Sequence, residues 1–177
     1  MGTPDGRRIC SIATAPPPRP TASELPTFTY CRTWSGFVYV AFVVDCSLQA
    51  IVGWHVASAK DTSMVTTALK MALWRRDHMR RSIVDGLIHH GDAGSQYTSI
   101  AFAETLVLEG IAASIGSVGD AFDNALAETT IGLYKIEAIG RGNPFLSGPL
   151  RTVDHVEYAT MDWVDWFNNL RLHGLLD

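Results

Sequence analysis

Two polar stretches decide how this chain folds. Residues 87–99 read LIHHGDAGSQYTS, and residues 119–128 read GDAFDNALAE. The first predicts a strand that gives way to a Gly-containing loop at Asp92, and the second predicts a helix that carries Glu128 in its first turns. Thirty-five residues lie between these two acids. One carboxylate at a strand end and one on a helix suit a site that holds Mg²⁺ against phosphate oxygens.

The patterns HxDxGSQYTS at 90–99 and DNAxAE at 123–128 resemble the second and third acidic motifs of a known family. That family is the insertion-sequence transposases with a retroviral-integrase-type core, whose catalytic triad is Asp-Asp-Glu. Two long motifs in this order make the resemblance specific, and it extends more loosely from Phe28 to His173. It implies a ribonuclease H-like fold and a transposase catalytic core, which serves DNA integration and transposition by metal-dependent phosphodiester cleavage and strand transfer.

The resemblance assigns roles to three residues. Asp92 and Glu128 match the second and third acids, which are catalytic and hold two Mg²⁺ or Mn²⁺ ions in the family. Lys135, two helical turns after Glu128, matches a basic residue that contacts substrate phosphate. From the residues alone, the alternatives are a turn-capping Asp, a Glu favoured by the helix dipole and a solvated Lys. We do not expect His89 and His90 to ligate one ion, because adjacent strand residues point to opposite faces.

The position of the first acid departs from the family pattern, which is roughly Trp-x-x-Asp-x-Thr-Tyr. Residues 24–30 read ELPTFTY, so Thr27 stands where the metal-bridging aspartate is expected. Threonine is neutral and cannot bridge two cations. We expect Glu24 to face the opposite side of a strand from position 27, and Asp45 to cap the turn after the second strand. Neither replaces the missing acid, so catalysis is expected to be impaired in this copy.

The organisation along the chain predicts an arm followed by one domain. Residues 1–24 contain five of the eight prolines and no apolar period, which predicts a disordered arm. A functional arm and a frame-shifted start are the open alternatives. Residues 25–177 are expected to form the integrase-type core. The resemblance implies a C-terminal truncation, because the chain stops soon after residues 167–173, where family members usually continue.

Apolar and helical periods predict an α/β fold. Three strands with short turns predict an antiparallel meander, after which helices alternate with two further strands. With the resemblance, we expect a ribonuclease H-like, five-stranded mixed sheet flanked by helices. The expected strands are 28–33, 37–44, 50–56, 87–89 and 111–115, and the expected helices begin near Asp61, Ser99, Asn124 and Val153.

Two helices carry side chains whose role has alternatives. The last helix has an apolar stripe that includes Trp163 and Phe167. Aromatic side chains can form a base-stacking platform, but their helical spacing predicts core packing. The first helix ends in Arg75 and Arg76, followed by further arginines. A solvated helix end is expected there, with phosphate contact as the alternative.

Composition indicates one globular domain, since 47% of the 177 residues are hydrophobic and 18% are charged. No apolar run approaches the ~20 residues of a membrane helix, so no membrane partner is expected. Three cysteines without a C-x-x-C pair predict reduced thiols in the cytosol. A net charge of −4 argues against a dedicated nucleic-acid binder, but not against a core that shares its DNA contacts with another chain or domain.

The expected partners follow from the resemblance. They are DNA, as element ends and target, and further subunits in a homo-oligomer or an assembly with related transposase subunits. The expected location is the bacterial cytosol, in association with the nucleoid. Whether this copy is an enzyme stays open. The alternatives are a catalytically inactive DNA-binding or subunit-pairing module and a metal-dependent nuclease of the same fold.

Overall fold

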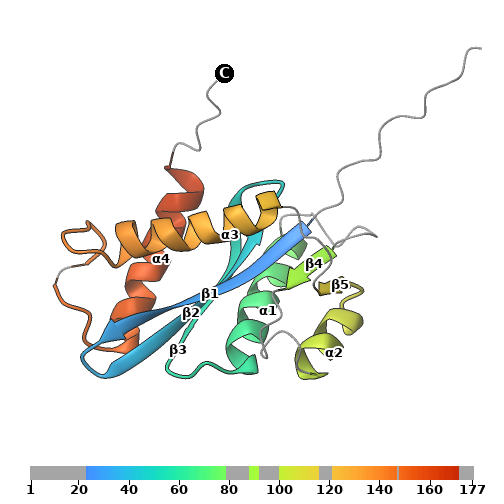
Figure 1. The fold of residues 1–177 in the computed structure, drawn as a ribbon, viewed down its shortest axis with the longest axis horizontal. Helices are drawn as coiled ribbons and strands as arrows, with labels where there is room; N and C mark the ends of the chain where they lie inside the picture. Colours follow the sequence, from blue (N-terminus) through green and yellow to red (C-terminus); the bar gives the residue numbers. More distant parts are fainter. Residues whose placement is uncertain (1–22, 79–87, 92–99, 116–120, 147, 172–177) are drawn as a thin grey trace, which may run out of the picture.

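A mixed sheet of five strands, in the order β3-β2-β1-β4-β5, forms the centre of the molecule, with helices on both faces (Figure 1). The computed structural model describes residues 23–78, 88–91, 100–115, 121–146 and 148–171. The predicted α/β fold with a five-stranded mixed sheet is confirmed. No helix within these ranges is long and apolar enough to cross a membrane.

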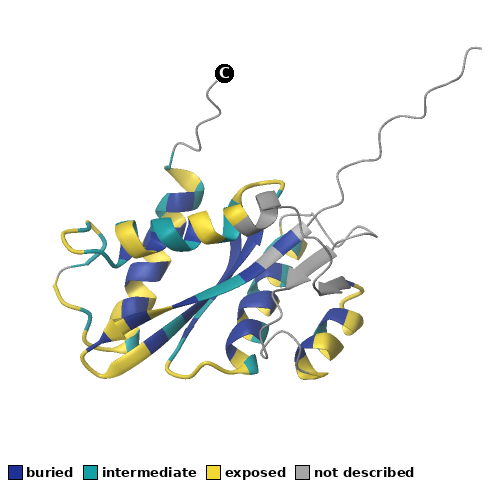
Figure 2. Ribbon diagram, viewed as in Figure 1, coloured by how far each residue is buried: buried dark blue, intermediate teal, exposed yellow. Residues whose placement is uncertain are grey.

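The first three strands form the predicted antiparallel meander. β1 spans Ser23–Thr33, β2 spans Gly36–Asp45 and β3 spans Ala50–Ala57. β2 lies between the other two strands, and its residues from Val40 to Asp45 are all buried (Figure 2). Continuous burial follows from the helices on both faces, which is why this strand reads as an unbroken apolar run.

β1 begins five residues earlier than the sequence predicts. Pro26 lies in register with Val43 of β2 even though proline disfavours a regular strand. The described pairing of β1 with β4 covers only Ser23 and Glu24. At Pro26 the described pairing of β1 is therefore with β2 alone, and such a position tolerates a residue without an N–H. Ser23 and Glu24 therefore belong to the sheet and not to the predicted arm. The rest of that arm, residues 1–22, lies outside the described residues.

Helices and strands then alternate along the chain. α1 spans Thr62–His78, β4 spans Ile88–Gly91, α2 spans Ile100–Leu108 and β5 spans Ala112–Ile115. β4 pairs in parallel with both β1 and β5. Gly110 follows α2 at φ +69°, a left-handed conformation that glycine adopts without a Cβ clash.

The remaining helices pack on the other face of the sheet. α3 spans Ala121–Leu133 and continues into a π-helical turn, η1, at Tyr134–Ala138. α4 spans Val153–Asn169. α3, η1 and α4 cover one face, and α1 and α2 cover the opposite face (Figure 1).

Each face of the sheet has its own apolar core. On the α4 side, Phe42, Tyr134 and Trp163 meet edge to face, with ring centroids 5.0 to 6.0 Å apart. Trp163 and Phe167 of α4 are only 0% and 4% exposed, so the predicted core packing of the last helix is confirmed. On the opposite face, α1 and α2 bury Met64, Val65, Ala68, Leu69, Phe102 and Leu106.

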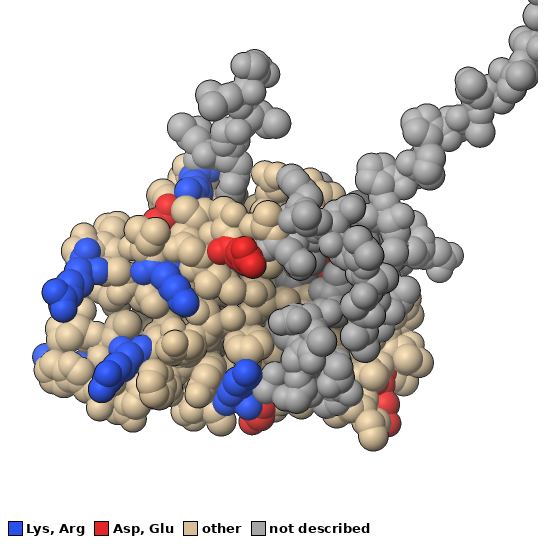
Figure 3. Space-filling model, in the orientation of Figure 1, with Lys and Arg blue, Asp and Glu red and all other residues tan. Residues whose placement is uncertain are grey.

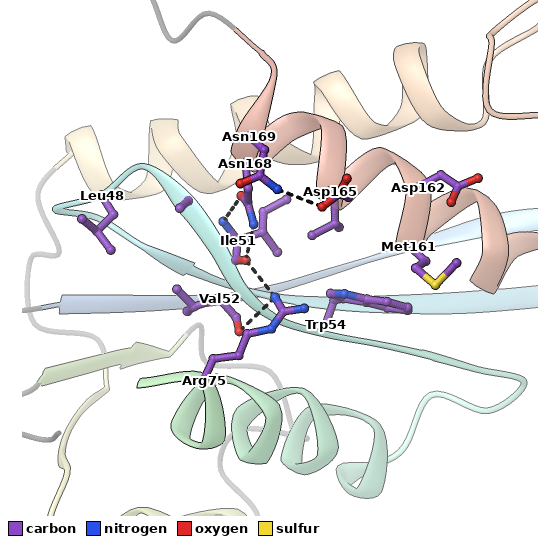
Figure 4. A pocket seen from close by; sticks show the side chains of 12 residues that line it. Leu48, Ile51, Val52, Trp54, Arg75, Met161, Asp162, Asp165, Asn168 and Asn169 are labelled. Carbon is purple, nitrogen blue, oxygen red and sulfur yellow. Dashed lines mark hydrogen bonds between the residues drawn. The ribbon is translucent and has the colours of Figure 1, made fainter. Parts of the chain in front are cut away.

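A side chain from α4 closes the outer edge of β3 (Figure 4). The Ile51 N–H donates to Asn168 Oδ1, and Asn168 Nδ2 donates to the Ile51 carbonyl oxygen, each at 2.9 Å. Arg75 of α1 reaches the same edge and donates to the carbonyl oxygens of Ile51 and Val52 at 3.4 and 3.5 Å. A cavity of about 600 Å³, lined by residues of β3, α1 and α4, lies beside these contacts. α4 is therefore held to the sheet by polar contacts as well as by its apolar stripe.

Candidate active site

Glu128 lies on α3, about two turns after the start of the helix. Its side chain is exposed to solvent. α3 contacts β1, so the carboxylate is carried by the helix that covers the first strand. An exposed acid on a helix packed over β1 is available to a metal ion or to a substrate.

Thr27 lies on β1, half-buried and in register with Phe42 of β2. Paired residues of an antiparallel ladder project from the same face of a sheet. Phe42 packs against Tyr134 of η1 and Trp163 of α4, so Thr27 faces the side that α3 covers. Thr27 and Glu128 thus belong to the same side of the sheet, as a shared metal site would require.

Asp92 is the first residue after β4 and lies outside the described residues. Within the described part, His89 of β4 pairs in parallel with Glu24 of β1. Asp92 follows His89 by three residues, as Thr27 follows Glu24. The approach of Asp92 to Glu128 stays a prediction, as does the role of the histidines, whose side chains are also outside the described part.

Glu24 points to the opposite face of the sheet, as strand alternation predicts. Arg76 of α1 donates through Nε to Glu24 Oε1 at 2.5 Å, and through Nη2 to Asp45 Oδ2 at 2.6 Å. The other oxygen of Asp45 accepts from the N–H groups of Ser47 and Leu48, at 2.9 and 3.0 Å. Asp45 therefore caps its turn, as predicted. Neither acid is free to replace the missing first acid.

Burial dominates the electrostatics of this buried ion cluster. Glu24 is 0% exposed, and desolvation raises the pKa of its carboxyl above the ordinary value of 4.5, although the neighbouring Arg76 cation opposes the shift. Glu24 Oε2 has no hydrogen-bond partner among the described residues. The cluster is thus a buried structural feature between the sheet and α1, and we do not interpret it as a second metal site.

The expectation of a solvated end for α1 is wrong for Arg76. Its side chain is only 11% exposed, and it forms ion pairs with Glu24 and Asp45 on two adjacent strands. The ion pairs join Arg76 to residues far away in the sequence, so no local sequence pattern predicts them. The available signal was two acids at the ends of neighbouring strands, which need a buried cation.

Lys135 lies in η1, and its side chain is exposed. Its ammonium group lies over the ring of Tyr30 on β1, with Nζ 5.6 Å from the ring centre. This cation–π contact holds the lysine against the strand that carries Thr27. Contact of Lys135 with a DNA phosphate stays a prediction.

The described donors do not by themselves fit a two-metal site. Within the described ranges, no group of three or more His, Cys, Asp or Glu side chains could hold a metal ion. Of the three positions of the acidic triad, these ranges include Glu128, which has a carboxylate, and Thr27, which has a neutral hydroxyl. Mg²⁺ and Mn²⁺ prefer carboxylate oxygens, so the predicted site depends on Asp92 as well.

A family model described as the integrase core domain matches residues 27–121. The chain is also similar to two bacterial transposases. It is 50% identical over 159 residues to the putative transposase for insertion sequence element IS986/IS6110 of Mycobacterium tuberculosis (strain CDC 1551 / Oshkosh), covering 89% of this chain and 55% of the relative. It is 47% identical over 154 residues to the transposase for insertion sequence element IS629 of Shigella sonnei, covering 87% and 48%. The chain thus spans about half the length of these relatives.

Solved structures with the same fold come from retroviral integrases. The HTLV-2 integrase catalytic core domain in complex with magnesium, in its trimeric form, aligns with a TM-score of 0.64 at 16% identity, covering 88% of this chain and 90% of that one. The catalytic core domain of BIV integrase aligns with a TM-score of 0.59 at 15% identity, covering 85% and 86%. These likenesses confirm the predicted ribonuclease H-like fold. The chain belongs to the integrase core domain family and, as its two acidic motifs predict, resembles the insertion-sequence transposases of that family.

Proposed function

We propose that this chain is the catalytic-core segment of an insertion-sequence transposase, in a copy that binds DNA but cleaves and joins it poorly. Identities of 50% and 47% to transposases support the class of reaction. The observation that carries the impairment is the position of Thr27, a neutral side chain on the sheet face that α3 and Glu128 cover.

Charge explains why this position matters. Two divalent cations that clamp a phosphodiester need several carboxylate ligands, and one of these must bridge the ions. Asp92 and Glu128 would supply two ligands, whereas Glu24 faces the other side of the sheet and is paired with Arg76. Losing a residue that merely orients a metal ligand already costs roughly 10–100-fold, so losing a bridging ligand costs more.

The proposal includes the partners and the location. The substrates are element ends and target DNA, the metal is Mg²⁺ or Mn²⁺, and the chain works with other subunits in the bacterial cytosol at the nucleoid. Assemblies occur among the structural neighbours: one is an intasome of simian T-cell lymphotropic virus, and the HTLV-2 core forms a dimer and a trimer. A catalytically inactive DNA-binding or subunit-pairing module is the second candidate, and the same Thr27 favours it.

Nicking of supercoiled plasmid tests the proposal, because it is measurable without knowledge of the element ends. With Mg²⁺ or Mn²⁺, the purified chain should bind DNA with an affinity that falls as salt rises, and it should leave the plasmid uncut. Metal-dependent nicking that disappears in the Asp92→Ala variant would overturn the impairment, and would mean that another acid completes the site. Absence of DNA binding even at low salt would remove both candidates that act on DNA.

A further inference from the structure

A second cavity lies on the side of the sheet that α3 covers, between the β1–β2 turn and the loop after η1. We call it the hairpin pocket. It has a volume of about 550 Å³, and its lining includes Arg32, Trp34, Ile139, Arg141, Pro149 and Leu150. Two of these residues are arginines, and no Asp or Glu belongs to the lining. The pocket is therefore suited to an anionic ligand.

The arginines of the hairpin pocket are available to such a ligand. Arg32 and Arg141 are both exposed, and neither takes part in an ion pair within the described part of the chain. Figure 3 shows Lys and Arg side chains gathered on the half of this face that is formed by η1, the loop after it and the β1–β2 hairpin. Uncompensated guanidinium groups beside a cavity favour phosphate, which they can bind through two hydrogen bonds.

Trp34 supplies a flat apolar surface at the same pocket. Its indole is 73% exposed, which is unusual for the largest apolar side chain, and the Arg151 guanidinium lies 5.1 Å from the ring centre. The backbone fixes this position, because the N–H groups of Trp34 and Ser35 donate to the carbonyl oxygens of Leu150 and Arg151, each at 3.1 Å. The main chain at Trp34 is thus held in place, and the ring has one face beside Arg151 and another face on which a flat ring can stack.

A phosphate site and a stacking surface in one cavity match a nucleotide, because a nucleotide has both a phosphate group and a flat base. We propose that the hairpin pocket binds one unpaired nucleotide of a DNA strand, with the phosphate on Arg141 and the base on Trp34. This inference rests on the proposed function, which supplies DNA as the polymer. An unpaired base is required, because a base inside a duplex has no free face to offer to the indole.

The distance from Glu128 sets where along the strand the nucleotide lies. Glu128 and Ala138, the last residue before the pocket loop, are ten positions apart along α3 and η1, which is about 15 Å at 1.5 Å per residue. A stacked DNA strand advances about 3.4 Å per nucleotide, so the pocket lies about four nucleotides from a strand held at Glu128. Lys135, over Tyr30, lies between the two points and can contact the intervening phosphates.

The test compares two fluorescent probes, an oligothymidine 12-mer and a blunt 12-base-pair duplex, by anisotropy at fixed salt. Trp34→Ala should weaken the single strand by about 5- to 150-fold, the loss expected for one stacked base, and should leave the duplex within about twofold. Trp34→Phe should restore most of the affinity, because a phenyl ring still stacks. Arg141→Ala should weaken the single strand as well, and by less as salt rises.

Matched controls lie on α1, away from this pocket. Trp74 is also exposed, at 60%, and stacks on His78, so Trp74→Ala should leave both probes unchanged. Lys70→Ala controls for the loss of one exposed cation. If Trp34→Ala leaves the single strand unchanged, or weakens both probes equally, the inference is overturned while the proposed function stands. If the unmodified chain binds neither probe at low salt, both are overturned.

Discussion

Glu24 and Thr27 are three residues apart on β1, and they face opposite sides of the sheet. Glu24 is buried against Arg76 of α1, whereas Thr27 lies on the side covered by α3. The strand therefore has a carboxylate, but on the wrong face for metal binding. Moving a carboxylate to the correct face takes one substitution.

Thr27→Asp should give the chain metal-dependent nicking of supercoiled plasmid, because it places a carboxylate on the sheet face of Glu128. Thr27→Asn is the matched control, since it has the same size as the aspartate but no charge, and it should stay inactive. Any activity gained should disappear when Asp92→Ala is added. Equal nicking by the Asp and Asn variants would contradict the prediction.

Asp92 and Glu128 should together hold one divalent cation in the unmodified chain. Mn²⁺ binding, followed by electron paramagnetic resonance, should weaken in Asp92→Asn and in Glu128→Gln, because each removes a charged ligand. The double variant should bind about as weakly as either single variant, since the two side chains act on one ion. Additive losses would indicate two separate weak sites. Glu109→Gln, on an exposed residue after α2, serves as the control.

Arg76→Met should lower the free energy of unfolding by about 3–5 kcal/mol at pH 7, because it leaves Glu24 and Asp45 buried without their cation. Urea unfolding measures the loss. Arg75→Met is the control: among the described residues, Arg75 hydrogen-bonds to backbone carbonyl groups of β3 and forms no ion pair, so its loss should cost less stability.

The same variant should show a characteristic pH dependence. Burial already raises the pKa of Glu24 in the folded chain, and removal of Arg76 raises it further. A carboxyl whose folded-state pKa is raised stabilises the fold below its unfolded value, near 4.5, and this contribution is lost as the pH rises through the folded-state pKa. The gap between Arg76→Met and the unmodified chain should therefore narrow from pH 7 to pH 5. A constant gap would show that Glu24 does not take up a proton.

Removal of residues 1–22 should leave the midpoint of thermal unfolding within about 2 °C, because these proline-rich residues carry no apolar period. Removal of residues 1–25 should lower it by many degrees, since it also removes the buried Glu24 and the β1 residues that pair with β4. Circular dichroism on heating distinguishes the two. A large drop with the shorter deletion would show that the arm packs on the core.

Local sequence patterns predicted the elements that depend on residues close together in the sequence. The apolar run of β2 and the helical stripe that buries Trp163 both appear where the sequence places them. The start of β1 was missed because Pro26 argues against a strand, and only its register with β2 overrides that preference. The role of Arg76 was missed because its partners lie on distant strands. The motifs and their spacing predict the candidate site, and its pairing of Asp92 with Glu128 stays a prediction because Asp92 lies outside the described residues. The hairpin pocket depends on a turn and a loop that meet only in the fold.

The contact between Asn168 and Ile51 also affects how readily the chain aggregates at high protein concentration. An outermost strand offers its free N–H and C=O groups to any other extended segment, which is how stacked β-aggregates start. The Asn168 side-chain amide hydrogen-bonds to both the N–H and the C=O of Ile51, so these groups are not free to pair with another strand at the edge of the sheet. That protection comes from side chains of the helices, Asn168 of α4 and Arg75 of α1, and not from the sheet itself. A partly opened molecule in which α4 has come away would expose an apolar rim, and fibril growth would begin at β3.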